Sequence, residues 1–238
     1  MSTLPVAAVI GVGPGLGAAV ARRFAREGFA VALLARRAES LAETEQQIRA
    51  AGGEALSVAA DAADPASVAA AFAEVRRKLG DTEVLVYNAS GFQMGKVVDL
   101  SPEVFESCWK VGCFGAFLAV REVVPAMVAR RRGTILLTGA TAALRGSANF
   151  AALAVPKFGL RALGQSLARE LHPQGVHVAH VVIDGAIDTP RIRTMMPDRA
   201  PETKLSPDAI AEAYWQIHRQ DPTTWTQEMD LRPAVEKF

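Results

Sequence analysis

The stretch that begins at Val6 reads Val6-Ala7-Ala8-Val9-Ile10-Gly11-Val12-Gly13-Pro14-Gly15-Leu16-Gly17. Its five leading apolar residues predict a buried strand, and the Ala- and Arg-rich segment after Gly17 predicts a helix. Glycines between a strand and a helix let the backbone turn tightly and bring its N–H groups onto a phosphate at the helix N-terminus. We therefore expect this turn to bind the pyrophosphate of a dinucleotide. The residues expected to bind it are Gly11, Gly13, Gly15, Leu16 and Gly17.

Short apolar runs recur along the chain and alternate with segments of helical periodicity. The runs are Val6–Ile10, Ala30–Ala35, Ala55–Ala59, Val84–Tyr87, Thr134–Thr138 and Val176–Ile183. Helix starts are marked by a capping side chain followed by proline, at Asp64-Pro65, Ser101-Pro102 and Ser206-Pro207. Alternating strands and helices predict a parallel sheet covered on both faces. The predicted fold class is α/β, a single doubly wound parallel sheet of Rossmann type in one domain, residues 1–238.

Composition excludes several classes of protein. The chain has 238 residues, of which 50% are hydrophobic, and 26 Lys and Arg balance 25 Asp and Glu. The only basic cluster, Arg130-Arg131-Arg132, predicts a capped helix C-terminus rather than a nucleic-acid surface. Cys108 and Cys113 lack the spacing of a disulfide framework or a metal site. No signal peptide and no apolar run of membrane-spanning length is recognisable. We expect a soluble cytoplasmic protein without metal, nucleic acid or membrane partners.

The segment from Asp184 to Leu205 differs from the other connections because it is long and holds Thr-Pro, Met-Pro and Ala-Pro pairs and two methionines. Doubly wound sheets bind ligands at the carboxyl ends of their strands, where this segment begins. Long loops at such places often close over substrates. We expect residues 184–205 to form a substrate lid.

Several motifs, in order, resemble the short-chain dehydrogenase/reductase family over nearly the whole chain. The family's T-G-x-x-x-G-x-G falls on Ile10 to Gly17, its N-N-A-G on Tyr87 to Ser90, and its P-G-x-x-x-T on Asp184 to Thr189. The lysine of its Y-x-x-x-K pair is Lys157. The resemblance implies that Asp61 lies against the adenine and that Lys157 holds the nicotinamide ribose. It also assigns Asn88, Gly185, Ile187 and Thr189 to the cofactor site.

The end of the second predicted strand decides which dinucleotide is preferred. Such folds place an acidic residue there to bind a ribose 2′-hydroxyl, or an arginine to bind a 2′-phosphate. The chain has Ala35 at the acidic position, followed by Arg36 and Arg37. We therefore expect NADP(H) rather than NAD(H). The alternative is that both arginines only cap or solubilise the next helix.

The catalytic part of the motif set is incomplete. The family's tyrosine, which gives or takes the hydroxyl proton, is replaced by Leu153, and its asparagine by Gly112. Spacing from Lys157 places the family's serine at Ala140, so Thr141 is the hydroxyl that could take its role. Leucine and alanine side chains can neither transfer a proton nor donate a hydrogen bond. The family's usual proton relay is therefore absent, and Lys157 supports cofactor binding more than catalysis.

Another residue would have to supply the proton in an active enzyme. The chain has two tyrosines, and we expect Tyr87, at the end of the fourth predicted strand, to be the acid. Tyr214 is the other candidate, and either phenol could instead be a packing residue. His172, His177 and His180 are expected to be structural. The proline before Lys157, Pro156, predicts a helix that begins near Val155 or is kinked there.

Three interpretations remain open at the level of sequence. The first is an oxidoreductase that uses NADP(H) on a small carbonyl or alcohol substrate, with a non-standard proton donor. The second is a catalytically silent protein that binds NADP(H) or regulates a partner, and the third is a protein whose role is assembly. Segments Pro102–Arg130 and Val155–His172 match helices through which the family pairs subunits, which implies a homodimer or homotetramer.

Overall fold

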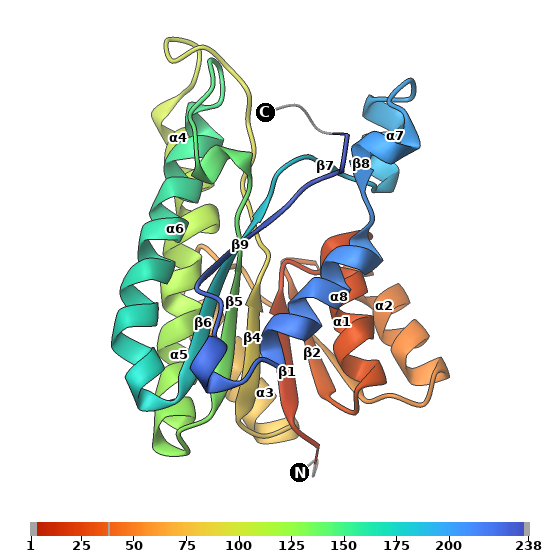
Figure 1. The fold of residues 1–238 in the computed structure, drawn as a ribbon, viewed down its shortest axis with the longest axis vertical. Helices are drawn as coiled ribbons and strands as arrows, with labels where there is room; N and C mark the ends of the chain where they lie inside the picture. The colour runs from red at the N-terminus through yellow and green to blue at the C-terminus, as the bar shows by residue number, and fades with distance from the viewer. Residues whose placement is uncertain (1–3, 38, 236–238) are drawn as a thin grey trace.

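The computed structural model describes residues 4–37 and 39–235. A seven-stranded, all-parallel sheet runs through the middle of the molecule, in the order β3-β2-β1-β4-β5-β6-β9 (Figure 1). Its strands are β1 (Val6–Ile10), β2 (Ala30–Ala35), β3 (Ala55–Ala59), β4 (Thr82–Tyr87), β5 (Gly133–Thr138), β6 (Val176–Ile183) and β9 (Glu228–Leu231). The predicted α/β doubly wound fold is confirmed.

Helices cover both faces of the sheet (Figure 1). One face carries α1 (Leu16–Arg26), α2 (Glu39–Ala50) and α8 (Pro207–His218). The other carries α3 (Pro65–Lys78), α4 (Pro102–Trp109), a π-helical turn η1 (Lys110–Phe114), α5 (Gly115–Ala129) and α6 (Ala151–Leu171). The strands between them are buried on both sides, which explains why they are continuous apolar runs.

The three predicted helix starts are confirmed. The side chains of Asp64, Ser101 and Ser206 each accept a hydrogen bond from a backbone N–H of the first turn of α3, α4 and α8. A proline follows each cap, at the position where its missing N–H has no helical partner. The basic cluster also lies where it was predicted, because α5 ends at Ala129 and Arg130 is its C-terminal cap.

One of the two alternatives for the helix around Pro156, the late start, is wrong, and one strand was not predicted. Helix α6 begins at Ala151 rather than near Val155, and it contains Pro156 in its second turn. The helix tolerates this proline because both it and Lys157 are buried among tertiary contacts that stabilise the turn. The last strand of the sheet, β9, was not predicted, since its sequence Glu-Met-Asp-Leu is short and half polar.

The segment predicted to be a lid is folded. It contains β7 (Ala186–Ile187), α7 (Pro190–Met195), a 3-10 turn η4 (Pro201–Thr203) and β8 (Lys204–Leu205), and β7 pairs with β8 in a small parallel sheet. The side chains of Met195 and Met196 are exposed on α7 and just after it. This small unit lies at the edge of the molecule next to α8 (Figure 1).

One helical run passes a membrane-span criterion by length and composition alone. The 28 residues Pro102–Ala129, which join α4, η1 and α5, are long and apolar enough, and 44% of their most apolar window is buried inside the protein. The run is not continuously apolar, because Lys110, Arg121 and Glu122 interrupt it. The run packs against the sheet and α6, as a core helix does.

Candidate active site

A cavity of about 500 Å³ opens at the carboxyl ends of the central strands. The glycine turn after β1 forms one wall, and the ends of β5 and β6 with the start of the predicted lid form the others. The predicted site residues on its walls are Gly11, Gly13, Gly15, Leu16, Gly17, Asn88, Lys157, Gly185, Ile187 and Thr189. The position of the cavity agrees with the binding edge expected for a doubly wound sheet.

The glycine turn is shaped for close approach of backbone to a ligand. Gly11 has φ of +89°, and a Cβ there would lie 2.5 Å from the backbone nitrogen of Ala89. A Cβ on Gly17 would lie 2.6 Å from the Gly11 oxygen, so neither position accepts a side chain. Around Gly13, by contrast, the space that a Cβ would occupy is open. The turn therefore fits a diphosphate held by backbone N–H groups at the start of α1.

Lys157 and Leu153 lie one helical turn apart on α6, and both line the cavity. The Lys157 side chain is buried, and its Nζ donates a hydrogen bond of 2.7 Å to the backbone oxygen of Thr138. Burial lowers the pKa of this ammonium to about 8. Among the described residues, the cavity walls carry two cationic side chains, Lys157 and Arg191, and no carboxylate. The site therefore suits an anionic ligand. At the position of the family's tyrosine, the alkyl side chain of Leu153 faces the cavity.

The hydroxyl predicted to replace the family's serine is directed elsewhere. Ala140 lines the cavity, but Thr141 does not. The Thr141 hydroxyl donates a hydrogen bond to the carboxylate of Asp184, which is buried beside it. A substrate contact by Thr141 would require that bond to break, and the geometry gives no support for its catalytic role.

The expectation that Tyr87 faces the cofactor edge is not met. Its ring is fully buried among the side chains beneath α3, α5 and α6, and its hydroxyl donates a hydrogen bond to the Val111 oxygen. Burial raises the pKa of this phenol well above its ordinary value. Sequence placed Tyr87 at the correct strand end but could not show to which face of the sheet the ring points.

Tyr214 does not line the cavity either, although Thr138, the residue to which its hydroxyl bonds, does. It projects from α8 into the core on the opposite face of the sheet, and its hydroxyl donates to Thr138 Oγ1 at 2.9 Å. Burial raises the pKa of this phenol too. Neither tyrosine is therefore placed to give a proton to a ligand in the cavity.

The glycine at the family's asparagine position and the proline before Lys157 are sterically linked. A Cβ on Gly112 would lie 2.8 Å from Cβ of Pro156. The two residues face each other where η1 packs against α6, so the proline ring occupies the volume of any side chain at position 112. The two departures from the family pattern are thus one structural change.

This contact predicts a dependence between the two positions. We expect Gly112→Ala to lower the free energy of unfolding by about 1–3 kcal/mol, because the added methyl overpacks the contact with Pro156. Pro156→Gly removes the Cβ that a methyl group at position 112 would meet, so Gly112→Ala should cost less in the Pro156→Gly background than in the unmodified protein. Urea unfolding of the two single variants and the double variant measures the coupling. Additive effects of the two substitutions would contradict the contact.

The remaining predicted cofactor residues lie outside the cavity walls. Arg36 and Arg37 are exposed just after β2, and Asp61 is exposed just after β3.

Asn88 holds the glycine turn in place, since its Nδ2 donates to the Gly11 oxygen at 3.0 Å. Sequence reasoning missed Arg191, which follows Thr189-Pro190 at the start of the predicted lid and lines the cavity. Its position directly after the matched P-G-x-x-x-T motif was the available signal.

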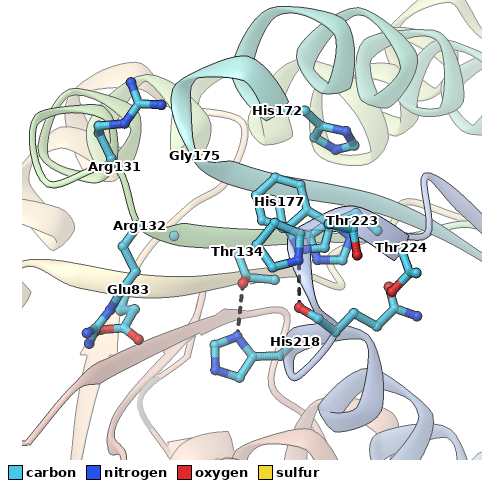
Figure 2. Close-up of a pocket in the computed structure, with 14 residues that line it drawn as sticks. Glu83, Arg131, Arg132, Thr134, His172, Gly175, His177, His218, Thr223 and Thr224 are labelled. Carbon is cyan, nitrogen blue, oxygen red and sulfur yellow. Dashed lines mark hydrogen bonds and ion pairs between the residues drawn. The ribbon is translucent and has the colours of Figure 1, made fainter.

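A second cavity, of about 730 Å³, opens at the amino ends of β5 and β6 (Figure 2). Its walls carry His172, His177 and His218, each already engaged. His172 accepts from the Val178 N–H, His177 bonds to the Thr226 oxygen and stacks on Trp225, and His218 bonds to Thr134. Within residues 4–37 and 39–235, no cluster of His, Cys, Asp and Glu has the geometry of a metal site. These histidines are structural, as predicted for His172 and His177.

The comparisons with known proteins agree with this site. The sequence matches the family model of the short chain dehydrogenases over residues 5–200. The chain belongs to the short-chain dehydrogenase/reductase family. A short-chain dehydrogenase from Rhodopseudomonas palustris is 38% identical, with a TM-score of 0.84 over 96% of this chain and 98% of that chain. The resemblance inferred from the motifs is confirmed.

Two further relatives indicate what members of the family do. A metagenomic short-chain oxidoreductase solved in complex with NADP is 32% identical, with a TM-score of 0.85 over 97% of this chain and 98% of that chain. The L-2,3-butanediol dehydrogenase of Corynebacterium glutamicum is 32% identical over 192 residues, which are 77% of this chain and 72% of the relative. This short-chain dehydrogenase/reductase is thus an oxidoreductase by family, and its family binds nicotinamide cofactors.

Proposed function

We propose that the protein is an NADP(H)-dependent oxidoreductase that acts on a small carbonyl or alcohol with a non-standard proton donor. One observation carries the proposal: the glycine turn and the buried Lys157 line a single cavity whose walls, over the part of the chain that the structure describes, hold two cations and no carboxylate. The relative solved with NADP supports the choice of nucleotide. A nicotinamide cofactor bound there would supply or accept the hydride.

The chain's own residues would divide the remaining work. Backbone N–H groups of the glycine turn hold the diphosphate, and Lys157 donates hydrogen bonds to the ribose. Phe92, Leu153 and Ile187 give the substrate end an apolar wall that excludes water. Of the side chains on the cavity walls, Lys157 has the pKa closest to neutrality, which favours its ammonium over Tyr87 as the proton donor.

The proposal is tested by binding and by turnover. NADPH fluorescence titration should show tight binding. With a panel of small ketones, aldehydes and quinones, the absorbance at 340 nm should show that NADPH is oxidised at the rate of a slow enzyme. Binding without turnover on any of them would instead support a catalytically silent NADP(H)-binding protein. Absence of binding would refute both.

The preference for NADP(H) predicts a specific loss. Arg36→Ala should weaken NADPH binding by about 10–150-fold, the loss of a charge-assisted hydrogen bond to the 2′-phosphate, and leave NADH binding unchanged. Arg37→Ala, which removes an equally exposed charge, is the matched control and should have a smaller effect. Fluorescence titrations of the unmodified protein and both variants with the two reduced nucleotides measure the six affinities. Equal affinities of the unmodified protein for NADPH and NADH would refute the preference.

We also propose that the protein acts in the cytoplasm as a homodimer or homotetramer formed through α5 and α6. Exposed aromatic and aliphatic side chains on these helices, Phe117, Val155 and Phe158, support such an interface. Light scattering of the purified protein measures the assembly.

A further inference from the structure

His180 is the buried member of a polar cluster that the family motifs do not describe, and the other members, Arg161 and Glu228, are partly exposed. Its ring is fully buried on β6, and its Nδ1 lies 3.1 Å from Oε2 of Glu228 on β9. Arg161 of α6 binds the same carboxylate with both Nε and Nη2, each at 2.7 Å. Arg161 lies one helical turn after Lys157. The three side chains therefore connect the edge strand β9 to the helix that carries the candidate active-site lysine.

Glu228 determines the tautomer of the His180 ring. The Arg161 guanidinium lowers the pKa of the Glu228 carboxyl, so this group is an anion that can only accept a hydrogen bond. His180 itself is neutral near pH 7, since burial lowers its pKa to about 4 despite the bond to Glu228. The proton of the neutral ring must then be on Nδ1. Its Nε2 is left with a lone pair, which is the negative end of the imidazole dipole.

This lone pair faces the turn that anchors Lys157. Nε2 of His180 is buried and has no hydrogen-bond partner among the described residues. A Cβ on Gly139 would lie 2.5 Å from it, so the ring packs directly against the glycine backbone. The preceding residue, Thr138, supplies the carbonyl that accepts the hydrogen bond of Lys157 Nζ. The lysine and the histidine thus hold the same turn at the end of β5.

Of the charged groups near the His180 ring, Lys157 is the one that the lone pair on His180 Nε2 can influence. The charged groups that interact with the ring are Glu228 on β9, and Lys157 and Arg161 on α6. Arg161 is already paired with Glu228 at two nitrogens, whereas Lys157 Nζ has one hydrogen-bond partner among residues 4–37 and 39–235, the Thr138 oxygen. We propose that His180, with its tautomer fixed by Glu228, is a positioning residue that keeps Lys157 charged for its contact with the cofactor.

The chain offers a matched control in His177. It lies on the same strand, is equally buried, and likewise has a lone ring nitrogen without a partner. Its titratable neighbours are His172 and His218 rather than Lys157. His177→Asn should therefore reproduce the loss of a buried imidazole on β6 without changing the lysine.

The decisive measurement is the titration of Lys157 without cofactor. The ¹³Cε resonance of the lysine, assigned by its absence in Lys157→Met, should titrate near pH 8 in the unmodified protein. His180→Asn keeps an N–H for Glu228 but removes Nε2, and should lower that midpoint by about 0.5–1 pH unit. His180→Gln returns an acceptor near the Nε2 position and should restore it in part. His177→Asn should leave it unchanged.

A second arm, which rests on the proposed function, follows NADPH affinity against pH. As the pH is raised, Lys157 loses its charge and NADPH binding should weaken. In His180→Asn this loss should occur at a lower pH than in the unmodified protein, by the same shift as the lysine midpoint. If the lysine midpoint shifts but NADPH binding does not follow it, the role of Lys157 in cofactor binding fails and the coupling to His180 stands. An unchanged lysine midpoint in a cooperatively folded His180→Asn protein overturns the inference. His180→Leu, which fills the site without a lone pair and leaves the Arg161–Glu228 ion pair in place, should shift the midpoint in the same direction and decides the matter if His180→Asn does not fold.

Discussion

Leu153→Tyr should raise the rate of NADPH-dependent carbonyl reduction by about 10²–10⁴-fold over the unmodified protein. Leu153 lines the cavity one turn before Lys157, so a tyrosine there would bring its phenol to the substrate end beside a buried ammonium. A nearby positive charge lowers the pKa of a phenol and makes it a better acid near neutral pH. The measurement is NADPH oxidation at 340 nm with a panel of small ketones and aldehydes.

Leu153→Phe is the matched control, because it adds the same ring without the hydroxyl. It should leave the rate at the level of the unmodified protein. A Leu153→Tyr protein that binds NADPH but reduces nothing faster than Leu153→Phe would show that the missing tyrosine is not what limits turnover. Position 140 would then be the next to restore, since Ala140 lines the same cavity and its family counterpart is a serine.

Lys157→Met should lower any turnover by about 10²–10⁴-fold, because it removes both a ribose ligand and the proposed proton donor. Lys157→Arg keeps a cation for the ribose but has a guanidinium that does not release its proton, so it should retain more binding than turnover. Michaelis constants and maximal rates of the two variants separate these roles. Equal losses of binding and turnover in both variants would indicate that Lys157 is not the acid.

The same lysine predicts how stability depends on pH. Its pKa is lowered by burial from an ordinary value of 10.5 to about 8, so between these values the unfolded chain binds more protons than the folded one. The free energy of unfolding should therefore carry a contribution that rises from about pH 8 to about pH 10.5. Lys157→Met should lack this contribution, as measured by urea unfolding at a series of pH values. An identical pH dependence in both proteins would contradict the burial of a titrating lysine.

The sheet was predictable because its chemistry is local. Parallel strands covered on both faces are continuous apolar runs, and the runs predicted at Val6–Ile10, Ala30–Ala35 and Val176–Ile183 match β1, β2 and β6. Proline after a capping side chain likewise fixed three helix starts. Strand β9 escaped because its alternation of acidic and apolar residues extends over only four positions. It is held by tertiary contacts such as Glu228 with Arg161, which no local pattern contains.

The site could be predicted only to the extent that sequence motifs determine where the backbone of each residue lies. The glycine turn, Asn88 and Lys157 do meet at one cavity, because their motifs fix them to strand ends and to one face of α6. The proton donor was not predictable, since strand position alone does not say to which face Tyr87 turns. The glycine at position 112 faces Pro156, which is 44 residues later in the chain. Only the three-dimensional packing shows this contact. The preference of Arg36 for a 2′-phosphate stays a prediction.

The connection of β9 to β6 bears on how the protein is made. The backbone N–H of Asp184 bonds to the Leu231 oxygen, and Arg232 forms an ion pair with the Asp184 carboxylate. Thr141 donates to that same carboxylate, so the cavity wall after β5 is tied to residues that leave the ribosome late. A nascent chain could pair β1 to β6 before these residues emerge, but its cavity wall would lack the contacts of β9. Cofactor binding during synthesis should therefore await the release of the C-terminal strand.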